Sequence, residues 1–139
     1  MNNTHFFNVA KKISQQADYT GSSCVHIGCV VVYKGTILAK GANTNKTHSL
    51  QARYNLYRFN EPKTTYLPDK CHAEINALTK IKYLDINFSQ VHLYIYREFK
   101  NGKYAMARPC EACMRAIQHM GIKHIHYTTN YGIAYEKIL

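Results

Sequence analysis

Two short stretches of the sequence, CHAE at residues 71–74 and PCEAC at residues 109–113, carry the side chains on which its chemistry depends. His72, Cys110 and Cys113 supply one imidazole and two thiolates, a ligand set that suits Zn²⁺. Three protein ligands leave the fourth position of a tetrahedral ion for water, which is typical of catalytic rather than structural zinc sites. Glu74 is not needed as a ligand, so its carboxylate is free to act as a proton shuttle.

Two other interpretations of these residues stay open at this point. A lone C-x-x-C can be a redox pair in a reducing compartment, although that leaves His72 and Glu74 unexplained. A closed structural zinc site would take Cys71 as its fourth ligand. Consecutive helical residues point about 100° apart, which disfavours Cys71 and His72 on one ion and favours a buried thiol at Cys71.

The pattern His-x-Glu followed by Pro-Cys-x-x-Cys is typical of zinc-dependent deaminases, and the sequence resembles the cytidine/deoxycytidylate deaminase superfamily. The run ARPCEACMRAI at residues 107–117 looks most similar to phage-type dCMP deaminases. The resemblance implies an α/β fold, a three-layer α/β/α sandwich around a mixed, roughly five-stranded sheet. It also implies that Asn43, in a G-x-N context, and Ala73 and Arg108 lie against the substrate, with Arg108 alternatively reaching a phosphate.

The resemblance further implies a hydrolase acting on cyclic amidines, with Zn²⁺ as cofactor. The expected reaction is hydrolytic deamination of a cytosine nucleotide or nucleoside, dCMP or deoxycytidine to dUMP or deoxyuridine. A zinc hydroxide would attack C4 while Glu74 moves the proton. One alternative is a single-stranded DNA or RNA cytosine deaminase, and a weaker one is an inactive deaminase-fold module that binds nucleic acid. Members of the superfamily are often oligomers, so a homo-oligomer is expected.

The composition predicts one domain over residues 1–139 with anionic partners. A net charge of +10 over 139 residues is large and favours nucleotides or nucleic acid as ligands. The segment 44–70 is predicted to be a basic, tyrosine-rich insertion. Its basic side chains would neutralise phosphate, and its aromatic rings would stack on bases. Its possible phosphate or nucleic-acid contacts are Lys46, His48, Arg53 and Arg58.

The location is predicted to be cytoplasmic. No apolar run approaches the roughly 20 residues that span a bilayer, so no membrane partner is expected. The first residues lack the pattern of a signal peptide. Five cysteines is an odd number, and free thiols in the apolar stretch 24–29 are typical of a reduced, intracellular protein.

Hydrophobic periodicity predicts helices over residues 4–18, 69–83 and 110–120, and a short helix within 49–59. Strands are expected over 25–33, 36–40, 91–97 and 122–128. The connection to the last stretch, 133–138, is too short for a parallel crossover, so a strand there should run antiparallel to its neighbour. In the superfamily that arrangement occurs in free-nucleoside deaminases, whereas deoxycytidylate deaminases usually have a helix there. The zinc site is expected where the N-termini of helices 69–83 and 110–120 meet.

Overall fold

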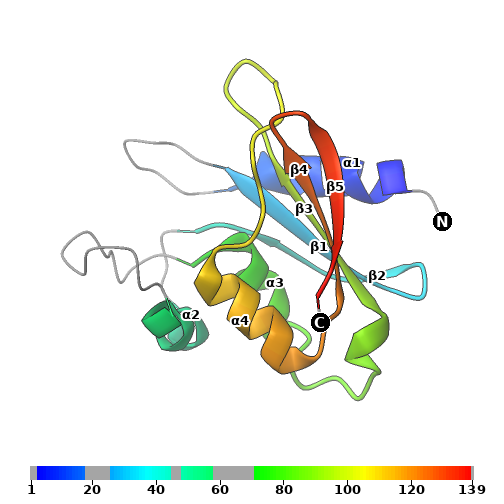
Figure 1. The fold of residues 1–139 in the computed structure, drawn as a ribbon, viewed down its shortest axis with the longest axis vertical. Helices are drawn as coiled ribbons and strands as arrows, with labels where there is room; N and C mark the ends of the chain where they lie inside the picture. Colours follow the sequence, from blue (N-terminus) through cyan, green and yellow to red (C-terminus); the bar gives the residue numbers. More distant parts are fainter. Residues whose placement is uncertain (1–2, 18–25, 45–47, 58–70, 139) are drawn as a thin grey trace.

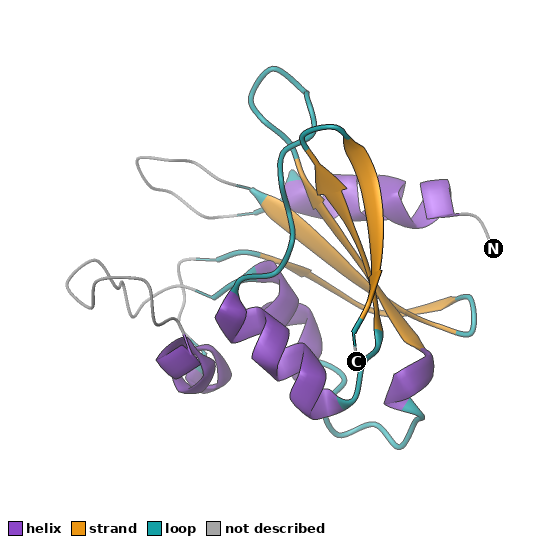
Figure 2. Cartoon of the chain, viewed as in Figure 1, coloured by secondary structure: helices purple, strands orange, loops and turns teal. Residues whose placement is uncertain are grey.

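The computed structural model describes residues 3–17, 26–44, 48–57 and 71–138. These residues form three layers, with helices on both faces of a twisted sheet (Figures 1 and 2). The predicted α/β/α sandwich with a mixed, five-stranded sheet is therefore confirmed.

The sheet has the strand order β2-β1-β3-β4-β5. Strand β1 (Ile27–Tyr33) pairs antiparallel with β2 (Thr36–Ala42) through a tight turn, where Lys34 and Gly35 both have positive φ. Two consecutive positive φ values match the right-handed twist of a hairpin. Strand β1 also pairs antiparallel with β3 (Val91–Arg97), which pairs parallel with β4 (His124–Thr129).

The last strand, β5 (Gly132–Lys137), runs antiparallel to β4 at the edge of the sheet. The short connection predicted this direction, because a connection of a few residues cannot make the crossover that a parallel pair of strands needs. No helix separates β4 from β5.

Helix α1 (Asn3–Ser14) packs on one face of the sheet. Its Phe6, Phe7 and Ala10 contact Val30 and Tyr94 in a small core. The contact is close at Gly28, where an added Cβ would lie 2.1 Å from the Ala10 carbonyl oxygen. A residue without a side chain is required there.

The larger core lies on the opposite face, beneath α3 (Ala73–Thr79) and α4 (Glu111–Met120). Val31, Leu93 and Ile125 lie side by side on the three central strands, and their side chains belong to this core. Helix α3 sits so close to β2 that a Cβ on Gly41 would lie 2.5 Å from the backbone nitrogen of Ala77. This approach fixes the height of α3, and hence of the CHAE stretch, above the sheet.

Short helices complete this side. Helix α2 (Ser49–Tyr54) continues into the 3₁₀ turn η1 (Asn55–Tyr57), and a second 3₁₀ turn, η3 (Phe88–Gln90), precedes β3. Helix α2 contacts both α3 and α4.

Several predicted boundaries are wrong by a few residues. Helix α3 begins at Ala73 because His72 is its extended N-cap residue, and it ends at Thr79 in a tighter turn in which the Lys80 N–H donates to the Ala77 carbonyl. Helix α1 ends at Ser14, whose hydroxyl donates to the Lys11 carbonyl. Such a side-chain bond competes with continuation of the helix. Strand β4 begins two residues later than predicted, at His124.

Among the described residues, no helix is both long and apolar enough to cross a bilayer.

Candidate functional site

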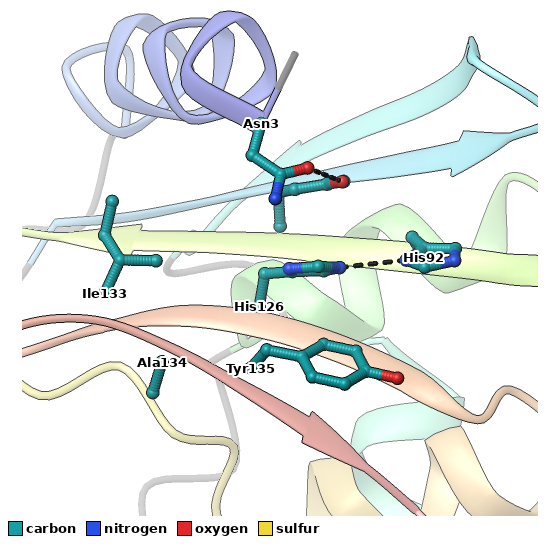
Figure 3. Close-up of a pocket in the computed structure, with 7 residues that line it drawn as sticks. Asn3, His92, His126, Ile133, Ala134 and Tyr135 are labelled. Carbon is teal, nitrogen blue, oxygen red and sulfur yellow. Dashed lines mark hydrogen bonds between the residues drawn. The ribbon is translucent and has the colours of Figure 1, made fainter. Parts of the chain in front are cut away.

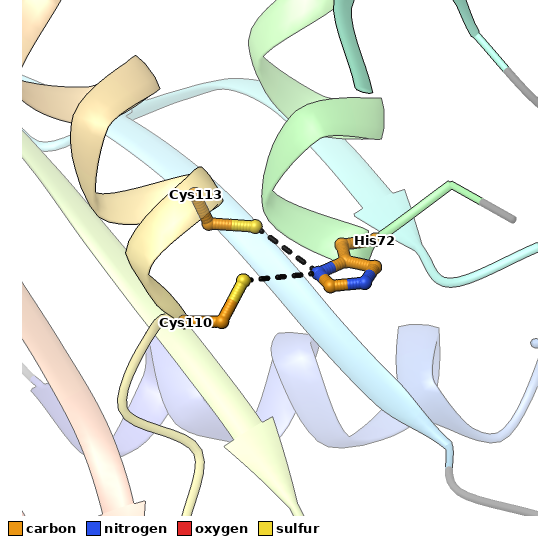
Figure 4. Close-up of side chains that lie close together, drawn as sticks. All are labelled: His72, Cys110 and Cys113. Carbon is orange, nitrogen blue, oxygen red and sulfur yellow. Dashed lines mark hydrogen bonds between the residues drawn. The ribbon is translucent and has the colours of Figure 1, made fainter. Parts of the chain in front are cut away.

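His72, Cys110 and Cys113 converge where α3 and α4 begin (Figure 4). His72 is the N-cap residue of α3, Cys110 is the N-cap residue of α4, and Cys113 lies one turn into α4. The prediction that two helix N-termini meet at this place agrees with the structure. Cys71 is not part of this cluster, and its thiol donates to the His72 carbonyl instead.

The three side chains present a preformed set of metal-ligand atoms. His72 Nδ1 lies 3.2 Å from Cys113 Sγ and 3.5 Å from Cys110 Sγ. All three atoms lie within 4.8 Å of one another. Around a tetrahedral zinc, with Zn–S of about 2.3 Å and Zn–N of about 2.0 Å, nitrogen and sulfur ligands are roughly 3.5 Å apart. The geometry and the chemistry of the donors therefore fit Zn²⁺.

The two thiols differ in acidity. The pKa of Cys110 is lowered to about 3, chiefly because the Cys113 thiol donates a hydrogen bond to it and because the His72 imidazole is close by, while burial opposes the shift. The pKa of Cys113 is raised, because it is the donor of that bond and is buried. Cys110 is thus the first thiolate of the cluster, and a bound cation favours ionisation of the second thiol as well.

Glu74 lies one position after Ala73, in the first turn of α3. Its side chain is only 4% exposed, and its Oε1 atom has no hydrogen-bond partner among the described residues. Burial raises the pKa of this carboxyl, although the charge of His72 acts in the opposite direction. A buried carboxylate oxygen without a partner is costly unless a ligand or water satisfies it. The described residues therefore leave one buried oxygen of Glu74 without a hydrogen bond.

Two of the predicted substrate contacts, Ala73 and Asn43, lie next to the backbone that leads into His72. Ala73 is fully buried at the start of α3. Asn43 follows β2, and its Oδ1 accepts a hydrogen bond from the Ile27 N–H at 2.9 Å. The next residue, Thr44, pairs with Cys71 through two backbone hydrogen bonds of 2.9 Å. Asn43 is therefore tied to the chain segment that leads into His72.

Arg108 forms a bidentate ion pair with Glu136 of β5, with both N···O distances at 2.9 Å. The side chain of Arg108 is 49% exposed. Tyr127 also donates to Glu136, at 3.1 Å. The pair raises the pKa of Arg108 and lowers the pKa of Glu136. The guanidinium thus has a carboxylate partner already, which sequence reasoning did not anticipate.

The predicted basic contacts of the 44–70 segment are only partly described. His48 is the N-cap residue of α2, and its Nδ1 accepts from the Leu50 N–H at 3.0 Å. Arg53 is exposed on α2, with its guanidinium 5.9 Å from the centre of the Tyr54 ring. Lys46 and Arg58 lie outside the described residues.

A separate hollow of about 450 Å³ lies on the α1 face of the sheet (Figure 3). His92, Tyr94, His126 and Tyr135 line it, and His92 Nδ1 lies 2.8 Å from His126 Nε2. His92, Tyr94 and His126 occupy even-numbered positions of β3 and β4, whereas the odd-numbered positions of these strands face α3 and α4. Tyr135 belongs to β5 and lies directly opposite His126 in the strand register. The sheet therefore separates this hollow from the cluster of cysteines and His72.

Sequence reasoning missed Gln51 of α2, whose side chain is fully buried and bonded to the backbone of His72. The surrounding sequence has no clear period, so nothing in it marks this glutamine. Glu136 was equally hidden, although it is one of only eight acidic residues in the chain.

Comparison with known proteins identifies the family. The family model described as the cytidine and deoxycytidylate deaminase zinc-binding region matches residues 1–129. A search of curated proteins finds no match.

Solved deaminase structures share the fold. The dCMP deaminase from cyanophage S-TIM5 is 24% identical, over 90% of this chain and 80% of that chain, with a TM-score of 0.58. Cytidine deaminase from Burkholderia pseudomallei is 16% identical, over 99% and 93% of the two chains, with a TM-score of 0.66. Guanine deaminase from Bacillus subtilis is 24% identical, over 93% and 65%, with a TM-score of 0.53.

The family match covers the whole region that holds His72, Cys110 and Cys113. It describes a zinc-binding region, and the cluster of these three residues fits zinc, so Zn²⁺ is the cofactor that the sequence predicted. The chain belongs to the cytidine and deoxycytidylate deaminase family.

Proposed function

We propose that this protein is a zinc-dependent hydrolytic deaminase of a cytosine nucleotide or nucleoside, with dCMP preferred. The observation that carries the proposal is the convergence of one imidazole and two thiols beside a buried carboxylate whose Oε1 has no partner. His72, Cys110 and Cys113 are the proposed zinc ligands, and Glu74 is the proposed catalytic residue.

Bound at these ligands, zinc supplies Lewis-acid activation of water. Glu74 then accepts a proton from the attacking water and passes it to the ring nitrogen beside C4. Burial raises the pKa of the Glu74 carboxyl above its usual value, and a carboxylate of raised pKa accepts a proton more readily. In the second half of the reaction Glu74 protonates the departing amine, so that water and the cytosine ring become uracil and ammonia. Ala73 and Asn43 are proposed to line the base.

The preference for dCMP is supported by the net charge of +10, which favours an anionic substrate. The cyanophage deaminase has also been solved in complex with dCMP and dUMP. A free nucleoside is the second candidate, and two observations favour it. Strands β4 and β5 are antiparallel with no helix between them, and Arg108 already has Glu136 as a partner.

A product assay with cytidine, deoxycytidine, CMP, dCMP, guanine and single-stranded DNA tests the proposed function. Release of ammonia from dCMP with the highest kcat/KM is the expected result. A higher kcat/KM for deoxycytidine would transfer the preference to nucleosides. Turnover of guanine alone, or of no compound by zinc-loaded protein, would contradict deamination of cytosine.

Replacement of Arg108 tests its proposed role as a phosphate contact. Loss of one charge-assisted hydrogen bond costs about 1.5 kcal/mol, or roughly tenfold. Arg108→Gln should therefore raise KM for dCMP about tenfold and leave KM for deoxycytidine within twofold. The control is Lys103→Gln, which removes an exposed cation near the Asn101 turn. Equal changes for both substrates would assign Arg108 to the ion pair with Glu136 alone.

A further inference from the structure

Helix α2 buries a polar side chain against the N-terminus of α3. Gln51 is 0% exposed, and both ends of its amide are bonded. Its Oε1 accepts from the backbone N–H of His72 at 2.9 Å, and its Nε2 donates to Asn55 Oδ1 at 2.8 Å. Only the oxygen of an amide accepts, so the N–H of His72 fixes which way the amide of Gln51 faces.

The hydrogen bond that the His72 N–H donates to Gln51 completes the backbone hydrogen bonding of His72. The His72 carbonyl accepts from the Asn76 N–H at 2.9 Å, as the first bond of α3. Its N–H lies ahead of the helix, where no helical carbonyl can reach it. With both backbone groups held, the extended conformation of His72 (φ −72°, ψ 155°) is fixed. That conformation sets the direction of the Cα–Cβ bond of His72. The Nδ1 atom of its ring faces the sulfurs of Cys110 and Cys113.

We infer that Gln51 is a positioning residue for the metal centre, which acts by holding His72 in the conformation that binds zinc. The inference rests on the proposed role of His72 as a ligand. Partners that hold a metal ligand in place typically contribute 10–100-fold to metal affinity. Gln51 acts on the backbone of the ligand rather than on its ring, so an effect of about tenfold is expected.

The same helix supplies a matched control. The hydroxyl of Tyr54 lies 2.8 Å from Nδ1 of His119, near the end of α4, and the two rings are 5.3 Å apart. Tyr54 thus anchors α2 to the far end of α4, whereas Gln51 anchors it to His72 of the cluster. Loss of the Tyr54 bond loosens α2 without removing a bond to His72.

The test compares Gln51→Met, Gln51→Glu and Tyr54→Phe with the wild-type chain. Met has nearly the shape of Gln but cannot accept the His72 N–H, while Glu keeps an oxygen at the same place. Zinc affinity is measured by competition with a chromophoric chelator. The visible absorption of the Co²⁺-loaded protein reports ligand geometry, and the melting temperature of the metal-free protein reports folding.

Gln51→Met should bind zinc about tenfold more weakly and change the Co²⁺ bands. Gln51→Glu should stay within about threefold of wild type. Tyr54→Phe should lower the melting temperature of the metal-free protein but keep the Co²⁺ bands and bind zinc within about twofold. If Gln51→Met does not fold, Gln51→Leu removes the same two bonds with a shorter side chain.

Unchanged zinc affinity and Co²⁺ bands in Gln51→Met or Gln51→Leu would overturn the inference. An equal loss of affinity in Tyr54→Phe would also overturn it, because the effect would then belong to the docking of α2 in general. A different result would contradict the proposed function. In that case His72→Ala would bind zinc as tightly as the wild-type chain, whatever the Gln51 variants do.

Discussion

At the scale of single residues, Glu74 is the group whose surroundings are hardest to explain without a reactant. It is buried beside Ala73 at the start of α3, yet its Oε1 has no partner among the described residues. A buried polar atom without a partner destabilises the protein by about 1–3 kcal/mol, so Oε1 is expected to have a partner other than the described residues. The burial of this carboxyl therefore agrees with a role in catalysis.

Glu74→Gln should keep zinc and fold while reducing kcat by about 10²–10⁴, the range typical of general acid–base catalysis. The amide has the shape of the carboxylate but cannot take up the proton of water. The measurements are the rate of ammonia release and the zinc content of the purified protein. Glu111→Gln is the control, because Glu111 is an exposed acid in the first turn of α4. Wild-type turnover in Glu74→Gln would remove Glu74 from the proposed mechanism.

Single residues also show what the sequence could predict and what it could not. The types and spacing of His72, Glu74, Cys110 and Cys113 were sufficient to predict one cluster, because the pattern itself selects a chemistry. Arg108 was predicted to reach a substrate, but no local pattern could show that Glu136 lies beside it. That partner comes from β5, 28 residues further along the chain, and its position depends on the pairing of β4 with β5.

At the scale of elements, strands β3, β4 and β5 carry a row of rings on the face that α1 leaves partly open (Figure 3). His126 stacks on Tyr94 with ring centres 4.2 Å apart, and His92 stacks on His124 at 4.3 Å. Burial and then the charges of His92 and His124 lower the pKa of His126 to about 4. The strand pairing thus keeps an imidazole neutral inside the row.

Stability should therefore fall on acidification because of His126. Between its unfolded pKa of about 6.5 and its folded pKa of about 4, the unfolded chain binds a proton that the folded chain does not. The contribution is present above pH 6.5 and is lost as the pH falls towards 4, by roughly 3 kcal/mol. Urea unfolding at pH 7.5, 6, 5 and 4.5 measures it. His126→Phe, which keeps a ring beside Tyr94, should flatten the curve in this window, and an unchanged slope would contradict the prediction.

At the scale of the whole molecule, the proposed zinc ligands come from two different crossover segments. Helix α3 leads from the β1–β2 hairpin towards β3, and α4 connects β3 to its parallel neighbour β4. The ligand atoms on the two helices lie within 4.8 Å of one another. A cation that binds the folded chain more strongly than the unfolded chain will stabilise the entire domain.

Removal of the metal should lower the melting temperature by about 10–20 °C. A ligand at 100 to 1,000 times its Kd stabilises by about 3–4 kcal/mol, and each kcal/mol corresponds to roughly 3–5 °C in a domain of this size. Scanning calorimetry with and without a zinc chelator measures the shift. His72→Ala provides the control, because a chelator should not change its melting temperature. No shift in the wild-type chain would argue against zinc at these residues.

The sequence by itself determined the chemistry and the class of fold. The ligand types, the acid beside them, the apolar strands and the short last connection are local properties, and each predicts its part independently. Only the tertiary structure decided the partners of individual side chains: Gln51 on the backbone of His72, Glu136 on Arg108, and the row of histidines across β3 and β4. These contacts join segments far apart in the chain, and they form only once the packing of helices and the register of strands bring the segments together.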